Sequence, residues 1–337
     1  MVMSASTMAP DARGTLGALN YMAPTVKSSL LRNGKVLTRR DRDGSDAGTE
    51  GMAMAEVELV VNDARCLSGS QRRTIETHGF ELFSRPLARP DLDFYDHQQV
   101  VRKYYDECAG IVQKATGAAR VLAFDHNIRS EVGKKSKRRI TGGQEVQEPA
   151  HDVHGDYTLT SGPQRLCDLA RPPSINDTLC LVLDEGQALL DPDRVERALG
   201  ETGRFAIINL WRNIAPAPVA IHPLALCDGQ TVNPEDLVVF EIHYHDRIGE
   251  NYFAKPAKQH EWWYYPAMTR DEALLIKQWD SAGELARSGG ARADSSIGGG
   301  HAPCSFSFHT AFTDRATPPD APDRESIEVR CIVLYSE

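Results

Sequence analysis

The feature that most restricts the fold of this chain is a series of short strand-like runs separated by turn residues. In the second half of the chain these runs span residues 205–211, 237–244, 260–265, 274–279 and 326–335. Short runs at this spacing are typical of an antiparallel barrel or sandwich. The first half adds an alternating run at 56–62 and a further strand or arm at 16–24.

One helix is predicted in the first half of the chain. Within residues 95–115, apolar side chains recur at helical spacing, as in Val100, Val101, Tyr104, Tyr105, Cys108, Ile111 and Val112. Such a helix buries one face against a sheet. We therefore expect a mainly β fold with flanking helices, of the α+β class.

Three segments are predicted to lie on the surface as loops. Residues 39–50 contain almost no apolar side chain, residues 134–139 read KKSKRR beside glycines, and residues 282–300 are rich in Gly, Ala and Ser. We therefore expect a partly mobile N-terminal extension over residues 1–55. A single domain over 56–337 follows, with a loop insertion at 282–300 that is long enough to act as a lid.

Charge and composition favour a small-molecule substrate. The chain has 337 residues, a net charge of -9 and a pI near 5.7, which argues against nucleic-acid binding. No apolar run is long enough to span a membrane, and the start of the chain lacks the pattern of a secretory signal. We therefore expect a cytoplasmic protein with neither a nucleic-acid nor a membrane partner, and the sequence is compatible with a homodimer.

The cysteines do not form a recognisable pattern. The 7 cysteines are scattered and include no Cys-x-x-Cys pair, so neither a disulfide framework nor a structural zinc site is predicted. Nucleotide-binding and hydrolase motifs are also missing from the sequence.

The first candidate for chemistry is the pair His154 and Asp156. In a strand, residues two apart point to the same side, so this pair presents an imidazole and a carboxylate to one point. Together they supply two of the three ligands of a two-histidine, one-carboxylate iron(II) site. Such a site leaves coordination positions open for a cosubstrate and dioxygen.

The third ligand must be one of the downstream histidines. The candidates are His222, His243, His245, His260, His301 and His309. His309 is favoured because Arg324 and Ser326 follow it, on one face of the last predicted strand. A guanidinium and a hydroxyl suit the far carboxylate of 2-oxoglutarate. On the same strand Glu328 and Arg330 share the polar face, whereas Ile327, Val329, Cys331 and Val333 form the apolar face.

A rival metal site is open at this point. His243 and His245 also share one face of a strand, with His260 as a third ligand, although no anchor for a cosubstrate accompanies them. His151 is a further neighbour of His154, interpreted as an outer or surface residue.

The sequence also resembles a known family in several distinctive stretches. These are VNDAR (61–65), HGFEL (78–82), VHGDYT (153–158), IINLWR (207–212), PLALCDGQTVNPEDLV (223–238), ENYF (250–253), HEWWYYPAMTRDEALLIKQWDS (260–281), HTAF (309–312) and DRESIEVR (323–330). They resemble the non-haem iron hydroxylases and desaturases of specialised metabolism, the family of the cephamycin 7α-hydroxylation protein and the fungal meroterpenoid endoperoxidase.

The resemblance implies a fold, a cofactor set and a ligand set. The implied fold is a double-stranded β-helix, a jelly roll of the cupin type, and the cofactors are Fe(II), 2-oxoglutarate and O2. Iron would be held by His154, Asp156 and His309, and 2-oxoglutarate by Arg324 with Ser326. Arg212 is a second candidate for a carboxylate contact, with a structural salt bridge as the alternative. Pocket-lining roles are expected for Tyr157, Tyr252 and Trp262, for which core packing is the alternative.

The predicted function is an iron(II)- and 2-oxoglutarate-dependent oxygenase. It would catalyse hydroxylation, desaturation or oxidative cyclisation of a small-molecule intermediate in specialised metabolism. Halogenation is disfavoured, because Asp156 occupies the position that a halide would need. The alternative is a non-catalytic, cupin-like accessory protein that binds a metal or a metabolite.

Overall fold

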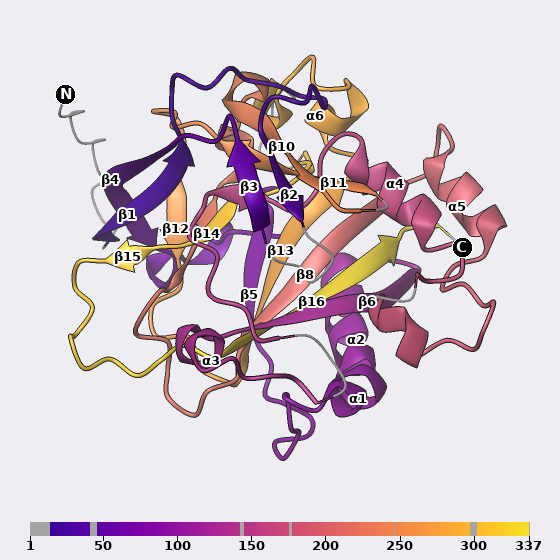
Figure 1. Ribbon diagram of the computed structural model, residues 1–337, viewed down its shortest axis with the longest axis horizontal. Coiled ribbons are helices and arrows are strands. Elements are labelled where there is room, and N and C mark those ends of the chain that lie inside the picture. Colours follow the sequence, from indigo (N-terminus) through magenta and orange to yellow (C-terminus); the bar gives the residue numbers. More distant parts are fainter. Residues whose placement is uncertain are drawn as a thin grey trace.

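The structure is a computed structural model, and it describes residues 14–40, 46–141, 145–174, 177–245, 247–296 and 302–336. Figure 1 shows a molecule built mainly from strands, with helices at its periphery. The predicted mainly β class is therefore confirmed. The strands are β1 (Gly14–Met22), β2 (Leu37–Arg40), β3 (Asp46–Glu50), β4 (Met54–Asp63), β5 (Phe80–Ser84), β6 (Arg120–Arg129), β7 (His154–Gly155), β8 (Phe205–Asn213), β9 (Leu224–Cys227), β10 (Leu237–His243), β11 (Ile248–Ala254), β12 (Trp262–Tyr264), β13 (Glu272–Asp280), β14 (His309–Ala311), β15 (Thr313–Asp314) and β16 (Ser326–Leu334).

The α-helices are fewer than the strands among the described residues. They are α1 (His97–Gln99), α2 (Tyr105–Thr116), α3 (Glu131–Lys135), α4 (Ser161–Asp168), α5 (Pro192–Leu199) and α6 (Glu284–Arg287). A turn of π-helix over Val100–Tyr104 joins α1 to α2, so the predicted helix is confirmed as one nearly continuous element. It ends at Gly117, whose left-handed backbone (φ 66) suits a residue without a Cβ atom.

The strands form two sheets that share a core. The smaller sheet is antiparallel and has the order β5-β13-β8-β16-β6, and the larger sheet has eleven strands. One apolar cluster joins Trp211 and Ile276 of the smaller sheet to Leu226 and Trp263 of the larger one. The two sheets therefore pack face to face as a sandwich.

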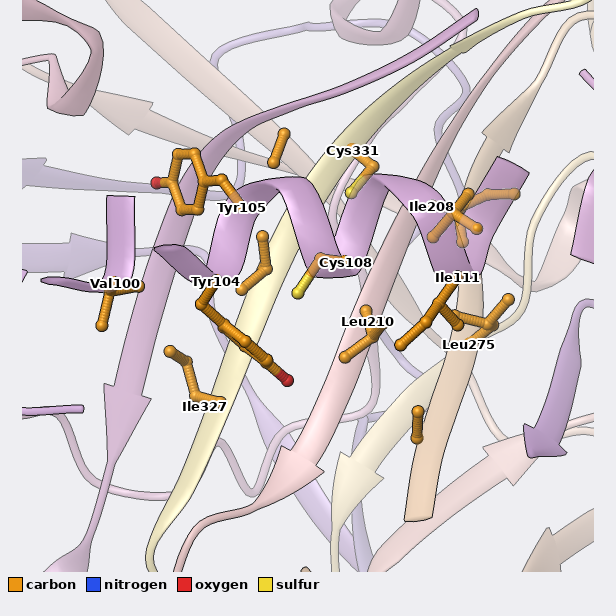
Figure 2. Close-up of a cluster of buried hydrophobic side chains, with 14 of the residues drawn as sticks. Val100, Tyr104, Tyr105, Cys108, Ile111, Ile208, Leu210, Leu275, Ile327 and Cys331 are labelled. Atoms are coloured by element: carbon orange, nitrogen blue, oxygen red, sulfur yellow. The ribbon is translucent and has the colours of Figure 1, made fainter. Parts of the chain in front are cut away.

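The outer face of the smaller sheet is covered by the predicted helix. Figure 2 shows Tyr104, Cys108 and Ile111 of this helical segment packing against Leu210 and Cys331 of the sheet. Burial of this apolar face provides the driving force for docking the helix.

The side chains of β16 alternate between an apolar face and a polar face. Ile327, Val329, Cys331 and Val333 belong to the cluster under α2. Ser326, Glu328 and Arg330 alternate with them and therefore face the opposite way, into the sandwich. The predicted division of this strand into a polar face and a core face is confirmed.

The N-terminal segment contributes strands from residue 14 onward. β1 pairs with β4 along its whole length, and β2 pairs with both β10 and β3. The prediction of a loop over residues 39–50 is wrong at both ends, because Arg39–Arg40 and Asp46–Glu50 are in paired strands. These polar residues are held by ladder hydrogen bonds, which do not depend on apolar side chains; residues 41–45 lie outside the described part.

The other two predicted loops are also more ordered than expected. Lys134 and Lys135 lie in α3, and the exposed remainder of the basic run follows as a turn. Residues 282–296 are not a surface loop, since Ala282 and Leu285 are buried and the carboxylate of Asp294 accepts hydrogen bonds from the backbone N–H groups of Leu285 and Ser305. Residues 297–300 lie outside the described part.

Two further observations concern the cysteines and the helices. All seven cysteines are free, and four of them are buried. Within the described ranges, none of the helices combines the length and the apolar character that a bilayer crossing requires.

Candidate metal centre

Two short strands of the larger sheet bring the predicted histidines together. His154 in β7 and His309 in β14 are directly opposed in an antiparallel pair, so their side chains lie on the same face. Asp156 follows His154 by two residues. The ring centroids of the two histidines lie 4.4 Å apart.

The three side chains aim their donor atoms at one point. Oδ1 of Asp156 lies 3.6 Å from Nε2 of His154 and 4.0 Å from Nε2 of His309. Within the part of the chain that the structure describes, this is the one group of three whose donor atoms lie within 4.8 Å of one another. Metal–ligand bonds of about 2 Å can bridge atoms at such separations, so the site fits a divalent transition metal.

His154 is prepared as a neutral ligand. Its Nδ1 hydrogen-bonds the carbonyl oxygen of Asp152 at 2.7 Å, which directs the lone pair of Nε2 at the site. Burial, and next the neighbouring His309, lower the pKa of His154 to about 4. The imidazole is therefore available to a metal at neutral pH.

Asp156 is held in its charged form by groups next to its Oδ2 atom, which points away from the two histidines. Its Oδ2 accepts a hydrogen bond from Nδ2 of Asn209 at 2.9 Å and lies 3.5 Å from Nε of Arg330. Burial alone raises the pKa of Asp156, but the charge of Arg330 and the hydrogen bond from Asn209 oppose burial, and the pKa lies well below its usual range. The backbone N–H of Asp156 donates to Gln278, which lies at a bulge in β13.

We expect Asn209→Ala to weaken metal affinity by roughly 10- to 100-fold, the usual effect of losing a hydrogen bond to a ligand. The reason is that Oδ2 of Asp156 loses its only side-chain hydrogen bond among the described residues. Titration of the metal-free protein with Fe(II) or Co(II) measures the effect. Asn213→Ala is the matched control in the same strand, because Asn213 donates to the backbone carbonyls of Ala217 and Met268. Equal affinities in the two variants would contradict this role of Asn209.

A small cavity adjoins the two histidines. It is lined by Arg129, Trp211, Arg324 and Glu328 in addition to His154 and His309. Trp211 and Glu328 are directly opposed in neighbouring strands of the smaller sheet, so this sheet forms the wall that faces the metal ligands. The site thus lies in the interior of the sandwich.

The predicted cosubstrate residues Arg324 and Ser326 both reach this region. Arg324 is 2% exposed, donates to the carbonyl oxygen of His222, and lies with its Cζ 5.6 Å from the ring centre of Trp211. Its Nε and the Oγ of Ser326 are buried and make no hydrogen bond within the described residues. Burial lowers the pKa of Arg324 to about 9.

Arg212 does not reach the cavity. It lies on the opposite face of β8, where Nε donates to the hydroxyl of Tyr104 and Nη1 donates to the carbonyl oxygens of Arg85 and Arg270, each at 2.7 Å. Its Nη2 lies 3.6 Å from Glu107. The structure thus assigns Arg212 to the contact between sheet and helix, and the expected cosubstrate contact is wrong in this geometry.

Two of the three predicted pocket aromatics are core residues. Tyr252 and Trp262 are 0% and 1% exposed and belong to the same apolar cluster. The hydroxyl of Tyr252 donates to the carbonyl oxygen of Leu30, and the indole N–H of Trp262 donates to the hydroxyl of Tyr21. Tyr157 directly follows Asp156, is partly buried and packs against another apolar cluster, which contains Phe124; burial raises its pKa to about 12.

The rival histidines are dispersed. His243 pairs with Glu241 at 2.8 Å, whereas His260 pairs with Asp236 at 3.1 Å and contacts Tyr21. His245 is exposed. His151 and His222 pack edge to face, 4.7 Å apart, beside Arg324 rather than at the three-residue group, and His301 lies outside the described residues.

Sequence reasoning did not single out Arg129 or Asn209. Arg129 lies at a strand end that carries no motif. Asn209 lies within the family-like stretch IINLWR (207–212), in which only Arg212 was considered. Arg330 was placed on the polar face of β16 but given no role; the structure puts it beside Asp156.

Known proteins resemble the chain over nearly its whole length. A family model described as "oxidoreductase/YMDC permease-like domain" matches residues 19–180 and 184–334. The chain belongs to this family. The prediction of an oxidoreductase is thereby confirmed at the level of the family.

Three relatives illustrate how proteins similar to this chain are named. A protein of Methylophilus leisingeri, named only as uncharacterized in the dcmA 3′ region, is 44% identical over 58% of this chain and 89% of its own length. The hydroxylase/desaturase efuI of Hormonema carpetanum is 25% identical over 99% of both chains. The alpha-ketoglutarate-dependent dioxygenase tstK of Talaromyces stipitatus is 28% identical over 94% of this chain and 99% of its own.

A solved structure agrees with the fold. The iron and alpha-ketoglutarate-dependent endoperoxidase NvfI superposes with a TM-score of 0.70 at 23% identity, covering 96% of this chain and 99% of that chain. The sequence-based resemblance to non-haem iron hydroxylases and desaturases is confirmed by these names.

Proposed function

We propose that this protein is an iron(II)- and 2-oxoglutarate-dependent oxygenase that hydroxylates or desaturates a small-molecule intermediate of specialised metabolism. The observation that carries the proposal is the convergence of His154, Asp156 and His309 beside a cavity lined by arginine. Two imidazoles and one carboxylate are the ligand set of iron(II) oxygenases. The two packed sheets are, in this proposal, the halves of a double-stranded β-helix.

The residues around the cavity fit a dicarboxylate cosubstrate. The guanidinium of Arg324 has a buried Nε without a partner among the described residues, and the neighbouring Oγ of Ser326 is likewise unpaired. Buried polar atoms of this kind are costly unless a ligand satisfies them. A carboxylate supplies acceptors for both the guanidinium fork and the hydroxyl.

The protein's own contribution is to orient and protect the reacting groups. When bound, iron(II) and 2-oxoglutarate supply the oxidising chemistry by activating dioxygen. His154 and His309 are neutral and buried, and Asp156 is ionised and partly buried. Asp156 also fills the ligand position that halogenation would leave to a halide, so the proposal is limited to oxygenase outcomes. Tyr157 is the one pocket aromatic that we retain in the proposal.

The decisive experiment is anaerobic reconstitution with Fe(II) followed by addition of 2-oxoglutarate. A weak visible charge-transfer band is expected, and admission of O2 should then release succinate and CO2. If the protein is folded and binds iron but produces neither band nor succinate, the proposal fails. That result would favour the alternative, a cupin-like protein that binds a metal or metabolite without oxidising it.

A further inference from the structure

We propose that Arg129 is a second cosubstrate-binding arginine, which contacts the 2-oxo acid at its metal-binding end while Arg324 contacts the far carboxylate. The inference rests on the proposed function and adds to it a division of roles between two guanidinium groups.

The position of Arg129 follows from strand pairing. Arg129 is the last residue of β6 and is directly opposed to Ser326 of β16. Opposed residues of an antiparallel pair share a face, so Arg129 joins Ser326 and Glu328 on the wall inside the sandwich. Arg129 and Arg324 both line the cavity that His154 and His309 adjoin.

Neither arginine has a carboxylate partner in the protein. Arg129 donates through Nη1 to the carbonyl oxygen of Glu148 at 2.9 Å, and Arg324 donates to the carbonyl oxygen of His222. Among the described residues, no carboxylate lies within 4.0 Å of either guanidinium. The carboxylate of Glu328 in the cavity wall is engaged by Arg330 at 3.2 Å, and Arg330 is further paired with Asp125 at 2.8 Å.

The cavity is therefore lined by two arginines that have no directly paired carboxylate among the described residues. Burial lowers the pKa of both arginines, and the charge of Arg129 lowers the pKa of Arg324 further. Two like charges that line one cavity oppose one another, and a bound dianion relieves both the repulsion and the desolvation. A ligand with one carboxylate would compensate only one of the two.

The positions of the two arginines relative to Asp156 separate their roles. Arg330 of β16 lies beside Asp156, and Glu328, Ser326 and then Arg324 follow at steps of two residues toward the N-terminus. Arg129 is directly opposed to Ser326. Arg129 is thus one step nearer to Asp156 along the strands than Arg324. A 2-oxo acid binds metal through its 2-oxo carboxylate end, which places that end near Arg129.

The test compares two ligands in anaerobic titrations of the Fe(II)-loaded full chain, followed by the visible charge-transfer band. The ligands are 2-oxoglutarate and 2-oxovalerate, which has a similar chain without the far carboxylate. The wild-type protein should prefer 2-oxoglutarate. Arg324→Gln should lose this preference, whereas Arg129→Gln should keep it and bind both acids roughly 10- to 100-fold more weakly, as expected for a lost hydrogen bond to a charged group.

Controls separate this role from a structural one. Arg129→Lys should recover part of the affinity for both acids and stands in for Arg129→Gln if the latter does not fold. Arg315→Gln removes an exposed arginine paired with Glu58 and should change neither affinity. Metal affinity measured without 2-oxo acid should be nearly unchanged in Arg129→Gln.

Three results decide the matter. Unchanged affinity of Arg129→Gln for both acids overturns the inference. Loss of affinity for 2-oxoglutarate alone also overturns it, because it would place Arg129 at the far carboxylate. If the iron-loaded wild-type protein binds neither acid, the proposed function itself fails, independently of Arg129.

Discussion

Replacement of His154 by Ala is expected to abolish stable iron binding and, with it, all succinate formation. His154 supplies one of three protein ligands, and its Nε2 lies 3.6 Å from the carboxylate that shares the site. Loss of an inner ligand should exceed the roughly 10- to 100-fold effect of losing an outer hydrogen-bond partner. Iron content after desalting, together with the charge-transfer band, measures the result.

The matched comparison is with the other histidines. His309→Ala should behave like His154→Ala, because its Nε2 lies 4.0 Å from the same oxygen of Asp156. His243→Ala should retain iron, because His243 is paired with Glu241 and takes no part in the three-residue group. Iron loss in His243→Ala with retention in His309→Ala would move the metal centre to the rival cluster.

Replacement of Arg212 by Gln is expected to lower the free energy of unfolding by roughly 3–5 kcal/mol, the usual effect of removing one partner of a buried ion pair. Arg212 is 0% exposed and holds together Tyr104, Glu107 and the carbonyl oxygens of Arg85 and Arg270. The variant leaves these groups buried and unpaired. Denaturant unfolding followed by circular dichroism measures the change.

The cosubstrate affinity of the folded variant is the discriminating readout. If Arg212 serves only to attach the helix to the sheet, folded Arg212→Gln should bind 2-oxoglutarate with nearly wild-type affinity. A large loss of affinity at unchanged stability would instead restore the cosubstrate role that the sequence suggested. Arg315→Gln again serves as the control for loss of one arginine charge.

The two faces of a buried strand can be told apart from the sequence only where they differ in polarity. In β16 one face is polar, so alternation predicted which side chains form core and which face the site. β8 is buried along its whole length. Each of its faces carries apolar residues, so hydropathy does not distinguish the two sides. Both readings of Arg212, a cosubstrate contact and a structural salt bridge, therefore stayed open until the structure placed it away from the cavity, whereas Trp211 and Asn209 face the cavity and Asp156.

Long-range pairing accounts for the other differences. The segment around residues 39–50 has few apolar residues, yet β2 and β3 are paired to each other and β2 also to β10. The sequence does not indicate whether Tyr252 and Trp262 line a pocket or lie in the core, because large aromatic side chains suit both places. Arg129 was not predicted, because its role depends on its position opposite Ser326, and the two residues are brought together only by folding.

The pairing of His154 with His309 has a consequence for the folding of the molecule. β7 has two residues, β14 has three, and one residue pair joins them. An ion shared by both histidines would act as a non-covalent cross-link between segments that are distant in the chain. Because the unfolded chain cannot present this ligand set, metal binding is linked to folding, and excess metal at a hundredfold above Kd would add roughly 2.7 kcal/mol to stability. The melting temperature of this protein therefore reports its metal occupancy.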